Sequence, residues 1–352
     1  MLAGRFSHSS FFVQCFFGCQ HHGQIPDKER TALIESFLML LQSSATHVDK
    51  LEQEDSRTPG FLSTIFVAYW RQEMDYQKWW RSEPVKQFWK SLPDNAGFWR
   101  EKLAFPASRV MAETNHHLKN GFSHVADFEP LVEKTGYWGA YRDRIEESTS
   151  DDKLSSPLEL AVPTEEHRPQ IKLGRTAFDK FPDNICFVVE GQDYGSMGST
   201  EKDYWFENLE KLSDDWIMTT ITTGHKDGIL SARLCHDPSS GPIKPATAGE
   251  SVPKAKALTL NRRIEYFYFL DMSYMERIGR KYKTHVALRR KFMEVYGPGG
   301  PMEGGKLVLW VDLGILKGQK MEAEYVGCFE GTGFLAYEDH PGFATKTDFG
   351  EV

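Results

Sequence analysis

A histidine near the start of a short helical segment is the strongest candidate for chemistry in this sequence. His285 follows Thr284, which can cap a helix whose Leu288, Phe292 and Val295 recur at helical spacing. An imidazole at such a position has one ring nitrogen free to point into a cavity. The spacing alone favours a simpler alternative, a partly exposed histidine at a helix start.

A serine and a group of possible metal ligands are the other chemical candidates. Ser231 lies on an expected strand over residues 229–235, where a serine is most often structural. The N-terminal segment brings four possible ligands together in sequence: Cys15, Cys19, His21 and His22. No second ligand pair follows them at a usual spacing, so we expect no zinc site there.

The segment that positions His285 begins with an aromatic run over residues 266–270, which predicts a buried strand. Ser273 and Glu276 have the spacing of a capping box, which predicts a helix start, and the helix weakens at Gly279. Residues 66–89 repeat this order of aromatic strand, polar turn, capped helix, break and second helix. The repetition indicates a weak internal duplication.

Two such copies predict an α+β fold of two ferredoxin-like halves. We expect packed antiparallel sheets, barrel-like in arrangement and flanked by helices. The halves of this single domain are expected at roughly 1–150 and 171–352, with a connector rich in Ser, Pro and Glu at about 146–170. His47 begins a polar, acidic stretch that ends near Pro59, which we interpret as an exposed loop.

Composition limits the possible partners and the location of the protein. The 352 residues suffice for one large domain or two intimate ones, and 13% aromatic residues with nine Trp suit large apolar walls. The net charge of −8 argues against a nucleic-acid partner, and no apolar run approaches the ~20 residues of a membrane helix. Five cysteines at irregular spacing favour a reducing compartment, so we expect a cytoplasmic location.

Six segments, taken in their order and spacing, resemble the haem-containing aldoxime dehydratase (phenylacetaldoxime dehydratase) family along nearly the whole chain. They are GYWGAYRDR (136–144), DNICFVVEGQD (183–193), GILSARLC (228–235), KTHVAL (283–288), KLVLWVDL (306–313) and AEYVGCFEGTGFL (323–335). None of these segments is a short generic motif, so the resemblance indicates a divergent member of that family.

The resemblance implies one haem b, ferrous in its active form, in a protein that is usually a homodimer. It implies dehydration of an aldoxime, R–CH=N–OH, to a nitrile, with a small hydrophobic oxime-like substrate bound to iron through nitrogen. His285 matches the proximal histidine of the family's THxxI/L pattern and would be the axial ligand of the haem iron. Ser231 matches the distal serine that hydrogen-bonds the oxime oxygen, which makes it the expected catalytic residue.

The sequence departs from the family pattern at two positions expected to line the distal pocket. Val311 stands where the resemblance places the distal histidine, and Val189 stands where it places the distal arginine. Dehydration needs a proton delivered to a poor leaving group, and valine cannot deliver one. The resemblance therefore implies an altered distal pocket.

Four side chains are alternative acids. Asp312 and Glu190 each follow one of the two valines, but side chains alternate along a strand, so each is expected to point away from the pocket. His225 and His236 lie in or near the loops that flank the strand of Ser231. The sequence does not decide among the four.

Three functions remain open at this point. The first is a haem-dependent lyase that acts on an aldoxime or on a related N–O or N–N substrate, which the retained Ser231 favours. The second is a haem oxidoreductase of peroxidase-like type. The third is a non-catalytic haem-binding or sensor protein, which the loss of the distal histidine and arginine favours, as it does the second.

Overall fold

The computed structural model describes residues 1–6, 11–22, 25–54, 61–131, 141–161, 170–244 and 255–345. Part of the family-like segment at 136–144 and part of the expected connector at 146–170 lie outside these residues. The helices of the described part include none that is long and apolar enough to cross a membrane.

The first structural unit has the element order β-α-β-β-α-β. It comprises β2 (Phe11–His22), α1 (Lys28–Gln42), β3 (His47–Glu54), β4 (Phe61–Trp70), α2 (Glu73–Trp80), α3 (Glu83–Ser91) and β5 (Phe98–Pro106). Its four strands lie in the order β5-β2-β4-β3 and are antiparallel at each pairing. This order is that of the ferredoxin-like motif.

The second unit repeats the same element order. It comprises β9 (Cys186–Asp193), α4 (Ser199–Asn208), α5 (Glu210–Thr222), β10 (Ile229–His236), β11 (Arg262–Phe269), α6 (Met272–Lys281), α7 (Lys283–Tyr296) and β12 (Val308–Ile315). Its strand order, β10-β11-β9-β12, is the order of the first unit read from the other side. The segment containing His285 is thus the equivalent of α2 and α3.

Six further strands extend the two units at their outer edges. β13 (Met321–Phe329), β8 (Ile171–Lys180) and β14 (Ala344–Thr345) continue the first unit beyond β5, and β6 (Val110–Thr114), β1 (Leu2–Arg5) and β7 (Asp127–Pro130) continue the second beyond β12. Each unit therefore receives strands from the other half of the sequence.

A short pairing between β3 and β10 joins the two units into one sheet of 14 described strands. Only Cys235↔Gln53 and His236↔Glu52 pair at this junction. The sheet is not closed, since β14 and β7 are its ends, so the barrel-like part of the predicted fold is corrected to an open sheet that folds back on itself. The α+β class and the antiparallel sheets are confirmed.

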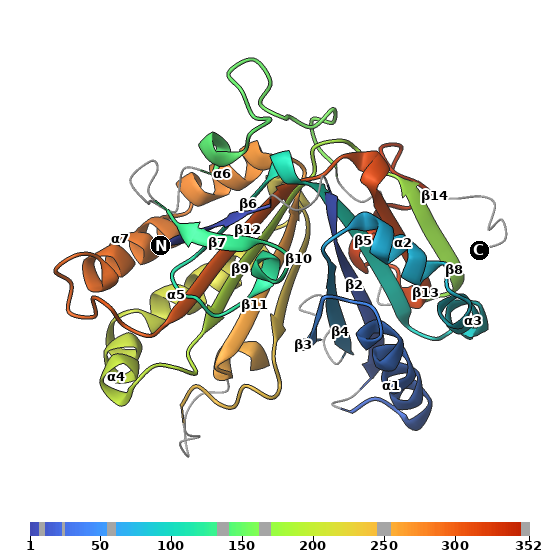
Figure 1. The fold of residues 1–352 in the computed structure, drawn as a ribbon, viewed down its shortest axis with the longest axis horizontal. Helices are drawn as coiled ribbons and strands as arrows, with labels where there is room; N and C mark the ends of the chain where they lie inside the picture. The colour runs from blue at the N-terminus through green and yellow to red at the C-terminus, as the bar shows by residue number, and fades with distance from the viewer. Residues whose placement is uncertain are drawn as a thin grey trace.

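The two units face each other as two arms (Figure 1), and the main core lies between their inner faces. Aromatic rings from β2 and β5 contact rings from β9 and β11, for example Phe16 with Tyr266 at 4.9 Å and Phe105 with Phe187 at 5.6 Å between centroids. Helices α1–α3 cover the outer face of the first unit, and α4–α7 cover that of the second (Figure 1). Both faces of each four-stranded centre are therefore buried.

The expected loop at His47 is wrong, because residues 47–54 form the strand β3. The segment alternates between buried and more exposed positions, with Asp49 and Leu51 inside. The polar composition of residues 47–54 favoured the loop prediction. The strand β3 lies at the junction of the units and buries a charged side chain as well as an apolar one. A carboxylate at a buried strand position requires partners, and Asp49 has them in Arg262 and His47.

Candidate active site

A cavity of about 410 Å³ lies on the outer face of the second unit, between its sheet and the helices α5–α7. The volume falls within the ~300–1,000 Å³ of ordinary ligand sites. Its walls are largely apolar, with Phe267 and Phe269 from β11, Trp216 from α5 and Phe292 from α7. His285 and Val311 also line this cavity, so the structure brings together two of the predicted site residues.

His285 is held by the end of the preceding helix. α6 ends at Lys281, and α7 begins at Lys283 after the single residue Tyr282, which places His285 in the first turn of α7. The ring nitrogen Nδ1 lies 2.7 Å from the carbonyl oxygen of Gly279, one of the last carbonyls of α6. Because a carbonyl can only accept, Nδ1 carries the proton, and Nε2 keeps the lone pair that a metal requires.

The predicted helix starts near His285 are corrected by the structure. Asp271, rather than Ser273, caps α6, because its carboxylate accepts from the backbone N–H groups of Ser273 and Tyr274. Tyr282, rather than Thr284, is the residue before α7, and its side chain makes no cap bond. These shifts move His285 from the helix boundary into the helix, where its orientation is fixed.

Glu190 points into the cavity, contrary to the expectation from strand alternation. In the register of β9 with β12, Glu190 lies directly opposite Val311, so both side chains share the cavity face. The Oε2 atom of Glu190 accepts a hydrogen bond of 3.1 Å from Nε1 of Trp216, whose ring lies 4.5 Å from the ring of His285. The chain of contacts Glu190–Trp216–His285 thus crosses the cavity.

A second carboxyl group, Glu265, lies beside Glu190. The two residues are direct partners in the register of β11 with β9. Glu265 is fully buried, and neither of its oxygens has a hydrogen-bond partner among the described residues. Burial, and then the charge of Glu190, raises the pKa of Glu265 well above its usual range, which favours the protonated form of this carboxyl group.

Val189 and Asp312 lie on the opposite face of the sheet. They are partners in the register of β9 with β12, and Val189 packs in the core between the two units rather than in the cavity. Asp312 accepts a hydrogen bond from the backbone N–H of Phe122, and burial raises its pKa to about 8. The prediction that Val189 lines the pocket is therefore corrected, while the expected orientation of Asp312 is the one observed.

Ser231 also faces away from the cavity of His285. It is the register partner of Tyr268, a residue of the inner core, and it lines a separate small cavity between the units together with Trp99 and Thr332. The register with β11 shifts between Ile229 and Ser231. The next residue, Ala232, packs against the core cluster on the helix-covered face of the sheet. Ser231, which the resemblance matches to a distal serine, therefore does not lie beside His285.

The two histidines considered as acids are engaged elsewhere. Nδ1 of His225 lies 2.7 Å from the hydroxyl of Tyr337 and 3.1 Å from the carbonyl of Ile229. His236 is fully buried at the junction of the units, where its Nε2 lies 3.4 Å from a carboxylate oxygen of Glu52. Neither residue lines the cavity of His285.

Sequence reasoning missed Trp216 and Glu265. Trp216 gave no signal beyond helical periodicity, because its role depends on contacts with two distant segments. Glu265 did offer one, since it interrupts the apolar run of β11 on the same face as Phe267 and Phe269. A charged residue at such a position is seldom fully buried unless it has a specific role.

The site has the features of a protein that binds a flat apolar group through one histidine. The cavity offers aromatic walls, an imidazole with one nitrogen fixed on a backbone carbonyl, and arginines, Arg280 and Arg289, among its lining residues. Such an arrangement fits a haem, whose iron takes an axial imidazole and whose propionates pair with cations. The residues present therefore fit a haem-binding class of α+β protein.

The sequence model of the family described as haem-containing dehydratase matches residues 15–334. The chain belongs to this family, and the resemblance stated from the sequence is confirmed. The proteins of this family contain haem.

Characterised relatives and solved structures agree with this assignment. The chain is 28% identical over 303 residues to a phenylacetaldoxime dehydratase of Bacillus sp. (strain OxB-1), covering 84% of this chain and 80% of the relative. It is 26% identical to an aliphatic aldoxime dehydratase of Rhodococcus globerulus, covering 84% and 77%. An aldoxime dehydratase crystallised with butyraldoxime has the same fold, with a TM-score of 0.75 at 20% identity and coverage of 95% of this chain and 88% of that one.

Proposed function

We propose that this protein dehydrates an aldoxime to a nitrile at a haem held by His285. The observation that carries the proposal is the position of His285, whose Nδ1 is bonded to Gly279 while its ring lines an aromatic cavity. Membership of the haem-containing dehydratase family, together with the names of the relatives, supports the reaction. When bound, ferrous haem supplies the iron that activates the N–O bond of the oxime.

The residues of the chain bind and orient the reactants. His285 would hold the haem iron through Nε2, and the bond from Nδ1 to Gly279 fixes the plane of the imidazole. Phe267, Phe269 and Val311 offer an apolar surface to the body of the substrate. Burial of that surface contributes ~25 cal/mol per Å², which favours bulky aryl or alkyl oximes over small polar ones.

Glu190 is our proposed proton donor in place of the family's histidine. Its carboxyl group lies opposite Val311 on the cavity face, one strand away from the position that the resemblance gives to the histidine. A proton that Glu265 passes to Glu190 would go on to the oxime hydroxyl, which leaves as water. The resulting carboxylate would accept the proton from the oxime carbon, so the nitrile forms and the acid is restored.

Glu265 would support this cycle from behind Glu190. Burial favours its protonated form, and it lies directly beside Glu190 on the neighbouring strand. Two carboxyl groups in one apolar site share protons readily, because ionising both is unfavourable. Glu265 is thus a positioning and proton-storing residue rather than one that contacts the substrate.

An absorption spectrum of the purified protein tests the proposal. We expect a Soret band, a histidine-type ferrous spectrum after dithionite, a shift on adding phenylacetaldoxime, and phenylacetonitrile as product in the reduced state only. His285→Ala should express and lose the Soret band. A histidine-type haem spectrum in that variant would overturn the ligand assignment.

Other outcomes of the same experiment distinguish the remaining functions. Binding of oxime without any nitrile in either oxidation state would indicate a haem-binding protein that is not a dehydratase. Nitrile formed at equal rates by ferric and ferrous protein would indicate acid–base chemistry independent of the iron. The homodimeric state and the cytoplasmic location stay predictions.

A further inference from the structure

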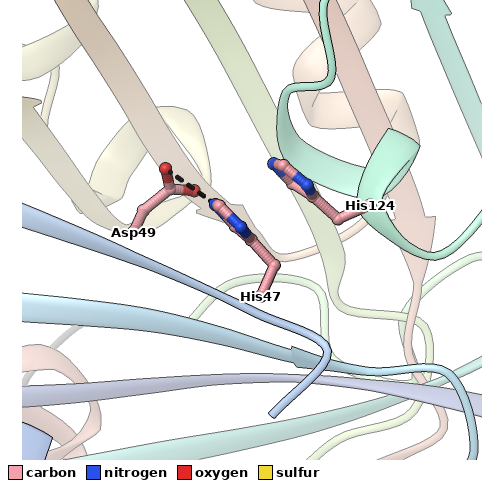
Figure 2. A group of neighbouring side chains, drawn as sticks. All are labelled: His47, Asp49 and His124. Carbon is pink, nitrogen blue, oxygen red and sulfur yellow. Dashed lines mark ion pairs between the residues drawn. The ribbon is translucent and has the colours of Figure 1, made fainter. Parts of the chain in front are cut away.

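Three potential metal ligands from distant parts of the chain meet where the two units join. His47 and Asp49 lie on β3, and His124 ends the short helix η2 (Gly121–His124), which follows β6. One ligand atom from each residue lies within 4.8 Å of those of the other two. Figure 2 shows the two imidazole rings one above the other, with a nitrogen of each on the side where the Asp49 carboxylate lies.

Two of the three groups carry buried acceptors that the described residues leave unpaired. Asp49 is 94% buried, and its Oδ1 lies 3.3 Å from Nε2 of His47 and 3.0 Å from a nitrogen of Arg262. Its Oδ2 and the Nε2 atom of His124 are buried without a hydrogen-bond partner among the described residues. A buried acceptor without a donor is unfavourable, so these atoms call for a cation or a donor between them.

The arrangement of the two rings also suits a cation. The rings of His47 and His124 are parallel within 8° at 3.5 Å between centroids, a distance at which two imidazolium ions would repel. Neutral imidazole and ionised carboxylate are the forms that bind metals.

We infer that His47, Asp49 and His124 form a binding site for one divalent first-row transition-metal ion, for which Zn²⁺ is the best-matched example. Two imidazoles and one carboxylate are a frequent protein donor set for such ions. Ligand bonds of about 2.0–2.2 Å place tetrahedral donors about 3.4 Å apart, so donors that lie up to 4.8 Å apart must approach by up to about 1.4 Å. Rotation of His47 can achieve this, because its side chain is 35% exposed and leaves a route for the ion.

Arg262 orients the Asp49 carboxylate and does not compete with the ion for Oδ2. It holds Asp49 through Oδ1, which leaves Oδ2 for the ion, and its other terminal nitrogen donates to Asn120. Such second contacts orient metal-binding carboxylates. Asp237, 3.9 Å from Arg262, offsets part of the positive charge that Arg262 and Lys119 bring to the site.

The site would connect the two units where their own pairing is shortest. β3 belongs to the first unit, whereas η2 is tied to the second through the bond from the Phe122 N–H to Asp312. An ion bound by both would add a cross-link to the two residue pairs that join β3 with β10. Ligands that bind only the folded state stabilise it, so thermal stability should depend on the metal.

Metal titration of the haem-loaded full-length protein, purified without a histidine tag and treated with a chelator, tests this inference. We expect one Zn²⁺ bound per chain by calorimetry and elemental analysis, with a rise in Tm of a few degrees. Asp49→Asn and His124→Phe keep the side-chain shapes but weaken the donors. Each should lower Zn²⁺ affinity at least tenfold and abolish the rise in Tm.

The matched control is His117→Ala, which removes an exposed histidine seven residues before His124. It should leave the affinity and the Tm rise unchanged. Zn²⁺ binding that resists both site substitutions, or that is lost with His117, would show adventitious surface binding and overturn the inference. Absence of stoichiometric binding in the wild type would show that the cluster holds water or an internal hydrogen-bond network only. If His124→Phe does not fold, Asp49→Asn alone decides.

Discussion

The cavity face of β9 carries an acidic group, Glu190, close to the position where the distal histidine of the family is replaced by Val311. The resemblance assigned Val189 to the pocket and alternation then assigned Glu190 to the opposite side, whereas the register with β12 gives the reverse. The proton source of the proposed reaction therefore shifts by one residue along the strand. Substitutions of Glu190 and of Ser231 distinguish a proton donor at Glu190 from a catalytic role of the serine implied by the resemblance.

Glu190→Gln should lower kcat for phenylacetaldoxime by about 10²–10⁴, the usual contribution of a positioned general acid. Glutamine keeps an oxygen that can accept from Trp216, so the haem content and the Soret band should not change. The measurement is kcat under dithionite beside the haem spectrum of each variant. A loss of haem together with activity would instead indicate a structural role.

Ser231→Ala is the control for that experiment. The resemblance predicts a loss of about 10²–10³ in kcat for a catalytic hydrogen-bond donor, whereas the observed position of Ser231 predicts a kcat within a few-fold of wild type.

Val311→His tests the role of Glu190 by a gain of activity. It places an imidazole opposite residue 190 and should restore part of the activity to Glu190→Gln. Full activity in Glu190→Gln combined with a large loss in Ser231→Ala would contradict our assignment.

Among the elements, β12 and η2 depend on the protonation of Asp312. Burial raises its pKa from 3.8 to about 8, so between these values the folded protein holds a proton that the unfolded chain has released. The free energy of unfolding should then fall as pH rises from about 4 to about 8, at no more than about 1.4 kcal/mol per unit, and level off above that. Asp312→Asn keeps the acceptor for Phe122 and removes the proton.

Thermal unfolding of wild type and Asp312→Asn across this pH range checks the effect. The variant should lose less stability than wild type between pH 5 and pH 8, with the two curves closest at low pH. Asp151→Asn, at an exposed carboxylate, is the matched control and should follow the wild type. Parallel curves for Asp312→Asn and wild type would show that Asp312 is already ionised in the folded protein.

Among the secondary-structure elements, the sequence predicted the order of strands and helices. It did not predict the features that depend on strand pairing and register. The repeated strand–helix–helix order revealed both β-α-β-β-α-β units, because aromatic runs and turn residues are local signals. The polar strand β3 was missed because its burial comes from distant segments: it pairs with β4 along its length and with β10 only near its end. The face of Ser231 was missed because the register shift after Ile229 cannot be read from alternation.

Across the whole molecule, a buried ion pair connects the inner faces of the two units. Arg233 of β10 donates two bonds, of 2.8 and 2.6 Å, to the carboxylate of Glu101 on β5. The hydroxyls of Tyr268 and Tyr325 also donate to this carboxylate, at 2.9 and 2.7 Å. Both charges are thus fully satisfied, and removing one partner leaves the other buried and unpaired.

Arg233→Met should lower the free energy of unfolding by about 3–5 kcal/mol, as expected when one partner of a buried pair is lost. The double variant Arg233→Met with Glu101→Gln should recover part of that loss, since it removes the unpaired charge. Urea unfolding of the haem-loaded protein is the measurement. Lys211→Met, which removes an exposed pair with Asp215, is the control and should cost no more than about 1 kcal/mol. An equal effect of the two single substitutions would contradict the structural role of the pair.

The inner faces of the two arms pack against each other in the main core, and this determines how a small molecule reaches His285. A bending motion between the arms would expose the main core, so it is too costly to serve as an entrance. The cavity instead lies beneath α5–α7, and its outer boundary includes the half-exposed Met293 on α7. The association rate of a ligand should therefore follow local fluctuations of this helical cover. Substitutions on the outer surface of α7 should change how quickly a ligand arrives and departs, with little effect on how firmly the arms hold together.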